Sequence, residues 1–248
     1  MPGYRPLAIA HRGDSAHRPE NTIAAFGAAI AARCDGIELD VQLSRDGVPV
    51  VCHDGTLARY GGPRRALATM TAAELAACDV GAWFAPRFRG QGVPTLDAVL
   101  RRFGRRTRLL IELKVGRGRA GRARGARLAR AVAEVLARRG QGRRHWILCF
   151  ERHALAAIRR LDPGLTLVLN AERPPRGLAA LKRLGVAIVD LDQRRVTAAV
   201  VRRLNEAGLR VTTWTCNEPA VVRRVVAAGV DAVLSDKPRW LRGVLARA

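Results

Sequence analysis

The chain has 248 residues, of which 48% are hydrophobic, and a formal net charge of +23. This length and composition suit one large α/β domain or two small ones, and no window holds the roughly 18 uninterrupted apolar residues of a membrane helix. The first residues form a short apolar run with charges on both sides, which excludes a secretory signal and makes the cytoplasm the expected compartment. The cysteines lie far apart without a CxxC pair, so we expect reduced thiols.

The positive charge comes from 44 Lys and Arg residues against 21 Asp and Glu residues. Such an excess attracts polyanions, phosphorylated small molecules and anionic membranes, so peripheral contact with an anionic membrane is one hypothesis. The arginines are spread over nearly every predicted helix, which is typical of solvated faces, and we expect no specific nucleic acid partner. The stretch Gly116–Gly125, GRGRAGRARG, concentrates basic charge and is predicted to be a flexible solvated loop.

Strands and helices alternate through the first half of the chain, with one interruption. Apolar runs predict the strands, and amphipathic patterns predict the helices. In chain order, we expect a strand at 7–13, a helix from Asn21 or Thr22 to Cys34, strands at 36–44 and 48–53, a helix at 95–103, a strand at 109–114, a helix at 126–139, a strand at 145–150 and a helix to Leu161.

The second half has a more regular rhythm, because each helix ends at a glycine, the residue that most easily adopts the left-handed stop of a helix. Short β-branched runs separate these helices. The expected elements are a strand at 165–170, a helix ending at Gly185, a strand at 186–192, a helix at 197–207, a strand at 210–217, a helix at 218–228, a strand at 230–236 and a last helix that begins at Pro238.

Setting the short strand at 48–53 aside, eight strands remain, and a helix follows each of them, although an insertion precedes the helix after the second strand. Continuous apolar strands separated by helices indicate a parallel sheet, and eight such units in about 250 residues are the pattern of a TIM (β/α)8 barrel. We therefore predict a single barrel domain over residues 1–248. Residues 55–94 are predicted to form a small cap, inserted after the second strand and folded over one mouth of the barrel around Trp83 and Phe84.

Acidic side chains lie on two neighbouring predicted strands. Glu38 and Asp40 are two residues apart on the second strand and therefore share one face, and Glu112 lies on the third. Buried carboxylates are costly unless they are paired or hold a metal. An all-oxygen set suits Mg²⁺ or Ca²⁺ better than zinc, which favours His or Cys. The alternative is a metal-free cluster in which Arg12 and Lys114 pair with the acids.

Two histidines and two cations complete this candidate site. His11 and Arg12 end the first predicted strand, His53 ends the short extra strand, and Lys114 follows Glu112 by two residues. We predict that His11 and His53 serve as a general base and a general acid, with the order left open, and that Arg12 and Lys114 neutralise a phosphoryl group. A metal, two histidines and two cations indicate phosphodiester cleavage rather than acyl or hydride transfer.

Other polar residues near strand ends have structural interpretations. Asp190 and Asp192 repeat the two-residue spacing but match no motif, and Asp236 is expected to hold the last loop. Trp214 fits core packing and ligand binding about equally well. Three further histidines are expected at the surface or in the core: His17, His145 and His153.

Five sequence blocks resemble one enzyme family. The resemblance extends from about Ala10 to Pro238, and the blocks read HRGDSAHRPENT, DGIELDVQLSRDGVPVVCHDGTLAR, GVPTLDAVL, IELK and SDKP. On these blocks the chain resembles the glycerophosphodiester phosphodiesterases, within the superfamily of enzymes similar to phosphoinositide-specific phospholipase C. The resemblance implies a TIM barrel with a small inserted cap. It also implies hydrolysis of glycerophosphodiesters to sn-glycerol 3-phosphate and an alcohol, with a divalent metal, Mg²⁺ or Ca²⁺.

The same resemblance implies a role for each matched residue. The acid and base would be His11 and His53, the metal ligands Glu38, Asp40 and Glu112, and the phosphate contacts Arg12 and Lys114. Trp214 would line the glycerol or leaving-group side, and Glu20 would orient its neighbours. Tyr60 to Gly62 and Gln91 depart from the family pattern within the cap, which leaves the identity of the alcohol open.

Two other functions compete with this one. The same barrel could act on lipids, as a lysophospholipase D or a phosphoinositide-type phospholipase, and the basic surface would then help at an anionic membrane. A non-enzymatic polyanion-binding protein would use the charge alone and would bind nucleic acid in a salt-sensitive way. The sequence leaves the choice between Mg²⁺ and Ca²⁺ and the oligomeric state open.

Overall fold

The computed structural model describes residues 5–247. Its strands are β1 (Leu7–Ala10), β2 (Gly36–Leu43), β3 (Pro49–Val51), β4 (Arg108–Leu113), β5 (Trp146–Cys149), β6 (Thr166–Ala171), β7 (Val186–Asp192), β8 (Arg210–Trp214) and β9 (Ala232–Ser235). Its α-helices are α1 (Ile23–Ala31), α2 (Ala72–Ala77), α3 (Leu96–Phe103), α4 (Gly118–Arg139), α5 (Arg152–Leu161), α6 (Leu178–Leu184), α7 (Ala198–Glu206), α8 (Pro219–Ala227) and α9 (Pro238–Leu245).

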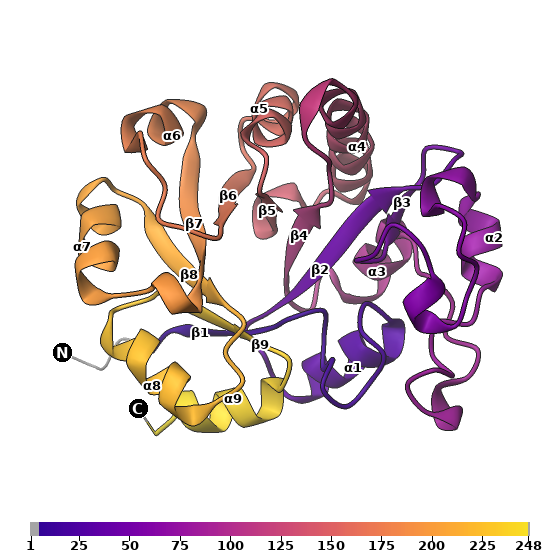
Figure 1. Ribbon diagram of the computed structural model, residues 1–248, viewed down its shortest axis with the longest axis horizontal. Helices are drawn as coiled ribbons and strands as arrows, with labels where there is room; N and C mark the ends of the chain where they lie inside the picture. The colour runs from indigo at the N-terminus through magenta and orange to yellow at the C-terminus, as the bar shows by residue number, and fades with distance from the viewer. Residues whose placement is uncertain (1–4, 248) are drawn as a thin grey trace.

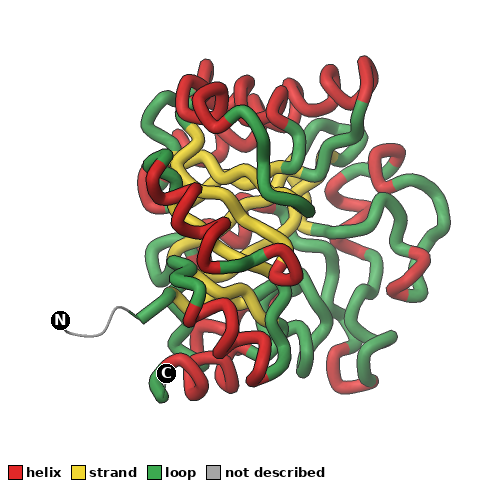
Figure 2. The backbone as a smooth tube through the Cα atoms, turned by 60° about the vertical axis from the view of Figure 1, so that its left-hand side comes forward, coloured by secondary structure: helices red, strands yellow, loops and turns green. Residues whose placement is uncertain are grey.

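Within residues 5–247, eight parallel strands close into a barrel in the order β1-β2-β4-β5-β6-β7-β8-β9, and β9 pairs with β1 again. β3 pairs with the end of β2 in antiparallel fashion and lies outside the ring. Helices surround the strands on the outside (Figure 1), and the turned view shows the strands enclosed by them (Figure 2). The predicted TIM barrel is confirmed.

The barrel interior is apolar except at the carboxyl ends of the strands, where polar side chains point inward. The inner cluster consists of Ile9, Leu110, Trp146, Leu148, Val168, Ile188, Ala232 and Leu234. Side chains alternate along a strand with a period of two, so the next inward positions after Ile9, Leu110 and Ile188 are His11, Glu112 and Asp190. The polar site of this protein is therefore the next inward layer above a packed core.

The first strand is shorter than predicted. It ends at Ala10 instead of Gly13, because Arg12 and Gly13 adopt left-handed backbone conformations with φ of 56° and 87°, which no strand can accommodate. A Cβ at position 13 would lie 2.8 Å from Ala25, so glycine is also required for close packing against α1. His11 and Arg12 are consequently turn residues. Thr22 caps α1, with its side chain accepting a hydrogen bond from the Ala25 N–H.

Residues 55–94 lie to one side of the barrel, next to β3, rather than across its opening (Figures 1 and 2). Their buried core is mainly aliphatic and consists of Leu57, Tyr60, Leu67, Met70, Leu75, Val80 and Val93, with Val50 and Cys52 from the segment around β3. Trp83 is 41% exposed and makes edge contacts with Tyr60 and Phe84. The prediction that Trp83 and Phe84 form the core of this segment is wrong, because aliphatic residues occupy it.

The prediction of a flexible basic loop at 116–125 is also wrong. Gly118 begins α4, a helix of 22 residues, and Gly121 and Gly125 are buried on it. A Cβ at position 121 would lie 1.8 Å from the Gly116 carbonyl oxygen, and one at position 125 would lie 3.1 Å from His153 Nε2. These glycines therefore serve close packing of the helix, and their spacing in the sequence does not indicate flexibility.

Replacing Gly121 by alanine should destabilise the protein by about 1–3 kcal/mol, because the added methyl group meets backbone that cannot move aside. The matched control is Gly27→Ala in α1, where an added Cβ meets nothing within 4 Å. That change should stabilise the protein by up to about 1 kcal/mol through helix propensity. Urea unfolding of both variants measures the difference. A Gly121→Ala protein as stable as wild type would show that the start of α4 is not closely packed against Gly116.

Candidate active site

Three carboxylates from two paired strands converge at the carboxyl end of the barrel. Asp40 on β2 is the register partner of Glu112 on β4, and Glu38 lies two residues before Asp40. One oxygen of each of the three lies within 4.8 Å of the others. All three are buried, with exposed fractions of 2% for Glu38, 1% for Asp40 and 8% for Glu112. Such a concentration of negative charge is unfavourable without compensation.

Two cations compensate part of this charge. Lys114 Nζ lies 2.8 Å from Glu112 Oε1 and 3.2 Å from Asp40 Oδ1, and Arg12 Nε lies 3.2 Å from Asp40 Oδ2. Burial alone would raise the pKa of Asp40, but Arg12 and Lys114 outweigh it and hold that pKa below its ordinary value. Asn21 adds a hydrogen bond of 2.8 Å from its Nδ2 to Asp40 Oδ2. Asp40 is thus a fixed, ionised carboxylate.

Glu38 is not compensated in this way. Its Oε2 accepts a hydrogen bond of 3.1 Å from the Arg12 backbone N–H, which the left-handed turn at Arg12 directs toward it. Its Oε1 is buried and has no hydrogen-bond partner within residues 5–247. Burial, followed by the neighbouring charges of Asp40 and Glu112, raises the pKa of Glu38 well above its ordinary value.

These features fit a divalent cation better than a closed ion-pair cluster. A cluster satisfied by Arg12 and Lys114 would leave no buried carboxylate oxygen unpaired, yet Glu38 Oε1 is unpaired. The pKa of Glu112 is raised as well, by burial and then by Asp40. Converging carboxylate oxygens are the ligands that Mg²⁺ and Ca²⁺ prefer. Glu38, Asp40 and Glu112 are therefore the residues of the described chain that could hold such an ion.

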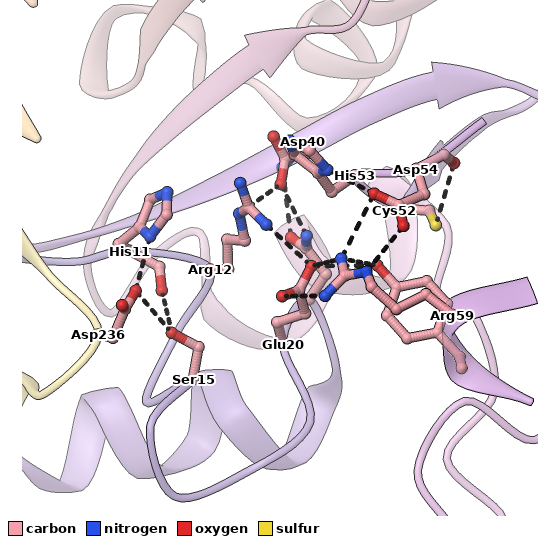
Figure 3. A network of polar contacts seen from close by, with 12 residues as sticks. His11, Arg12, Ser15, Glu20, Asp40, Cys52, His53, Asp54, Arg59 and Asp236 are labelled. Carbon is pink, nitrogen blue, oxygen red and sulfur yellow. Dashed lines mark hydrogen bonds and ion pairs between the residues drawn. The ribbon is translucent and has the colours of Figure 1, made fainter. Parts of the chain in front are cut away.

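His11 is oriented by a carboxylate from the far end of the chain (Figure 3). Its Nδ1 lies 2.7 Å from Asp236 Oδ1, and its Nε2 lies 3.9 Å from Glu38 Oε2. Asp236 is held in turn by the Ser15 hydroxyl at 3.0 Å and by Asn217 Nδ2 at 2.6 Å. Burial opposes ionisation of Asp236, but the hydrogen bond with His11 and the other donors lower its pKa to about 2.

His53 is oriented in the same way by its neighbour in sequence. Its Nδ1 lies 2.6 Å from Asp54 Oδ1, and Arg59 Nε donates to Asp54 Oδ2 at 2.7 Å. Arg59 Nη2 also donates to Glu20 Oε1 at 2.7 Å, and Glu20 accepts from Arg12 Nη1 at 3.0 Å. This chain of ion pairs, drawn in Figure 3, connects the 55–94 segment to both His53 and Arg12.

The electrostatic effects at these groups have identifiable causes. The buried setting of His53 lowers its pKa, which favours the neutral imidazole at neutral pH. The pKa of Glu20 is lowered because the hydrogen bond from Arg59 and the charge of Arg12 outweigh its burial. With Nδ1 of each histidine engaged by a carboxylate, Nε2 of each ring is the atom left to exchange a proton.

One cavity of about 150 Å³ collects these groups. It is lined by His11, Arg12, Glu38, His53, Glu112, Lys114 and Trp214, and also by Leu148, Phe150, Asn170, Asp190 and Leu234. Asp40 is the member of the predicted site that does not line it, and it pairs with Arg12 and Lys114 instead. Phe150 and Trp214 are in edge contact with ring centroids 5.9 Å apart and form an aromatic wall.

Comparison with known proteins decides the family. The sequence profile of the Glycerophosphoryl diester phosphodiesterase family matches residues 11–239. The chain belongs to this family. It is 32% identical over 239 residues to YhdW of Bacillus subtilis, an alignment that covers 94% of this chain and 95% of that protein. It is 31% identical over 242 residues to a glycerophosphodiester phosphodiesterase of Caldanaerobacter subterraneus, covering 96% of each.

Solved structures agree with this assignment. A phosphodiesterase of Oleispira antarctica, in complex with the product sn-glycerol-3-phosphate, matches the fold with a TM-score of 0.88 at 27% identity and 98% coverage of both chains. The present protein is accordingly a phosphodiester hydrolase with glycerophosphodiester phosphodiesterase activity. No helix in residues 5–247 of this phosphodiesterase is both long and apolar enough to cross a bilayer.

Sequence reasoning missed several residues of the phosphodiesterase site. Asp236 was expected only to hold the last loop, but it also contacts His11. Asp54 follows His53 directly, and this His-Asp pair was a signal that could have been used. Asp190 lines the cavity, whereas Asp192, two residues on, is buried outside it and pairs with the exposed Arg194. Phe150 and Asn170 carried no sequence signal, because they contribute only through their position at the ends of β5 and β6.

Proposed function

We propose that this phosphodiesterase hydrolyses glycerophosphodiesters to sn-glycerol 3-phosphate and an alcohol, with a divalent metal, Mg²⁺ or Ca²⁺, and with acid–base catalysis by His11 and His53. The observation that carries the proposal is the convergence of the Glu38, Asp40 and Glu112 carboxylates, two of which, Glu38 and Glu112, line one cavity together with both imidazoles. The Oleispira antarctica phosphodiesterase with sn-glycerol-3-phosphate bound supports the identity of the product. Glu38 Oε1 supports the metal, because within residues 5–247 it is buried without a hydrogen-bond partner, whereas the other such carboxylate oxygen, Asp40 Oδ1, has an ion pair with Lys114.

The mechanism follows from the positions of the side chains. Arg12 and Lys114 line the cavity and bind the phosphate, and their charge stabilises the phosphoryl oxygens as negative charge develops on them. A bound divalent ion would add Lewis-acid stabilisation of the same charge. Asp40 pairs with both cations and so holds them beside the cavity.

The two imidazoles move the protons. His11 Nε2 accepts the proton of the nucleophile, and Asp236 on Nδ1 stabilises the imidazolium that forms. His53 acts in its imidazolium form: it donates the Nε2 proton to the departing alcohol oxygen, so that a neutral alcohol leaves and a neutral imidazole, with Nδ1 still engaged by Asp54, remains. The nucleophile is either water or the free 2-hydroxyl of the glycerol. Attack by the 2-hydroxyl would give a cyclic phosphate, which water then opens. Trp214 and Phe150 enclose the organic part of the substrate.

A substrate panel tests this proposal. Glycerophosphocholine, glycerophosphoethanolamine and glycerophosphoglycerol should each release glycerol 3-phosphate when Mg²⁺ or Ca²⁺ is added, and EDTA should stop the release. Lysophosphatidylcholine in the same assay tests the lysophospholipase D alternative. Turnover of the lysolipid with none of the water-soluble diesters would overturn the proposal in favour of that alternative, and metal-independent release of glycerol 3-phosphate would remove the metal from it.

A further inference from the structure

The half of the cavity opposite the carboxylates contains a second polar group. Asn170 on β6 is the register partner of Asp190 on β7, and Asp190 is the register partner of Thr212 on β8. The three residues therefore stand side by side at one level of the barrel. The inward positions two residues earlier on β6 and β7 are Val168 and Ile188, which belong to the apolar interior.

These polar side chains are buried and only partly satisfied. Asn170 is 4% exposed and Asp190 is 2% exposed, and both line the cavity. Asp190 Oδ1 accepts a hydrogen bond of 2.6 Å from the Thr212 hydroxyl. Asn170 Oδ1 is buried without a hydrogen-bond partner among residues 5–247. An unpaired buried amide oxygen costs folding free energy, and its position on the cavity wall means that a ligand could satisfy it.

The charges around Asn170 and Asp190 indicate what kind of ligand group would bind to them. Within the described chain, no Lys, Arg or His forms an ion pair with Asp190, and its pKa is raised to about 7 by burial. The cations of the cavity, Arg12 and Lys114, are engaged with the carboxylates on the other side. A phosphate belongs beside those cations, whereas the side with Asn170 and Asp190 suits an uncharged group that donates and accepts hydrogen bonds.

We propose that Asn170 and Asp190 form a hydroxyl-binding pair that recognises the alcohol part of the substrate while the phosphate lies against Arg12 and Lys114. The inference rests on the proposed function. Neighbouring strands are about 4.8 Å apart, so the two side chains can engage adjacent hydroxyl groups of one small polyol. The hydroxyls can belong to the glycerol that is retained as glycerol 3-phosphate or to a hydroxylated leaving group, and the two sources separate in the test.

The first measurement is calorimetric binding of sn-glycerol 3-phosphate and of methyl phosphate, which lacks the hydroxyls, to the Mg²⁺-loaded protein. Wild type should prefer glycerol 3-phosphate, and Asn170→Leu should reduce that preference about 10- to 100-fold, as expected when a buried polar partner is lost. The second measurement is the ratio of kcat/KM for glycerophosphoglycerol over glycerophosphoethanolamine, which isolates hydroxyls of the leaving group. A fall in the binding ratio of glycerol 3-phosphate to methyl phosphate would show that the pair binds the hydroxyls of the retained glycerol. A fall in the kcat/KM ratio would show that it binds the hydroxyls of the leaving group.

Two further variants make the test decisive. Asp190→Asn keeps the size of the side chain and an oxygen for Thr212, so it reports on the pair even if Asn170→Leu folds poorly. Thr107→Val removes another buried side-chain oxygen without a partner, just before β4 and outside the residues that line the cavity, and should change neither ratio. Unchanged ratios in both site variants, or equal losses for ligands with and without hydroxyls, would overturn the inference. Binding is measured without turnover, so a wild-type protein that cleaves no diester would refute the proposed function separately.

Discussion

Replacing His11 or His53 by alanine should lower kcat by about 10²-fold or more while leaving the fold intact. Each imidazole lines the cavity and is oriented through Nδ1 by a carboxylate, which is the arrangement required of a proton-transfer group. The loss should appear in kcat more than in KM, because proton transfer takes place in the transition state. Steady-state rates on glycerophosphocholine, with thermal unfolding as a check on the fold, measure it.

A change of leaving group separates the roles of the two histidines. A glycerophosphodiester of 4-nitrophenol needs little protonation of its leaving group, so His53→Ala should recover much of its lost rate on that substrate and His11→Ala should not. His17→Ala is the matched control, since His17 pairs with Asp14 and its side chain is 63% exposed; its activity should equal that of wild type. Near-normal turnover in either site variant would remove that histidine from the mechanism. Recovery of His11→Ala, rather than His53→Ala, on the 4-nitrophenol substrate would show that His11 is the general acid and His53 the general base.

Saturating Mg²⁺ or Ca²⁺ should stabilise the protein, and Glu38→Gln should abolish this effect together with activity. An ion that binds only the folded state adds RT ln(1 + [L]/Kd), about 2.7 kcal/mol at a hundredfold excess over Kd. Glu38 supplies a buried carboxylate oxygen without a hydrogen-bond partner among residues 5–247, and glutamine keeps its size but loses the charge that a hard cation needs. Chemical unfolding with EDTA and with each metal measures the difference.

The same variant has a second expected result, which does not depend on activity. In EDTA, Glu38→Gln should be at least as stable as wild type, because it removes a buried and incompletely paired carboxylate. Glu134→Gln in α4, which lies outside the residues lining the cavity, should retain the full stabilisation by metal. Metal-induced stabilisation that persists in Glu38→Gln would show that the ion binds elsewhere.

Much of the barrel could be predicted because its signals are local. Apolar strands, amphipathic helices and helix-ending glycines are each contained within a few residues, and β7 has the predicted bounds of 186–192. The errors arose where a local signal has two meanings. Glycines in a basic stretch are typical of loops, but Gly121 is needed because α4 packs against the Gly116 backbone. Aromatic residues are typical of a core, but Trp83 lies at the edge of its segment.

The sequence by itself determined the metal-ligand candidates. Glu38 and Asp40 share a face because side chains alternate along a strand, and Glu112 joins them because β2 and β4 are neighbours in the parallel sheet. Only the tertiary structure decided which groups surround them. Asp236 reaches His11 across 225 positions because β9 pairs with β1 when the barrel closes. Asn170, Asp190 and Thr212 stand at one level because of the register of β6, β7 and β8, and strand register depends on packing between distant segments, which no short stretch of sequence specifies.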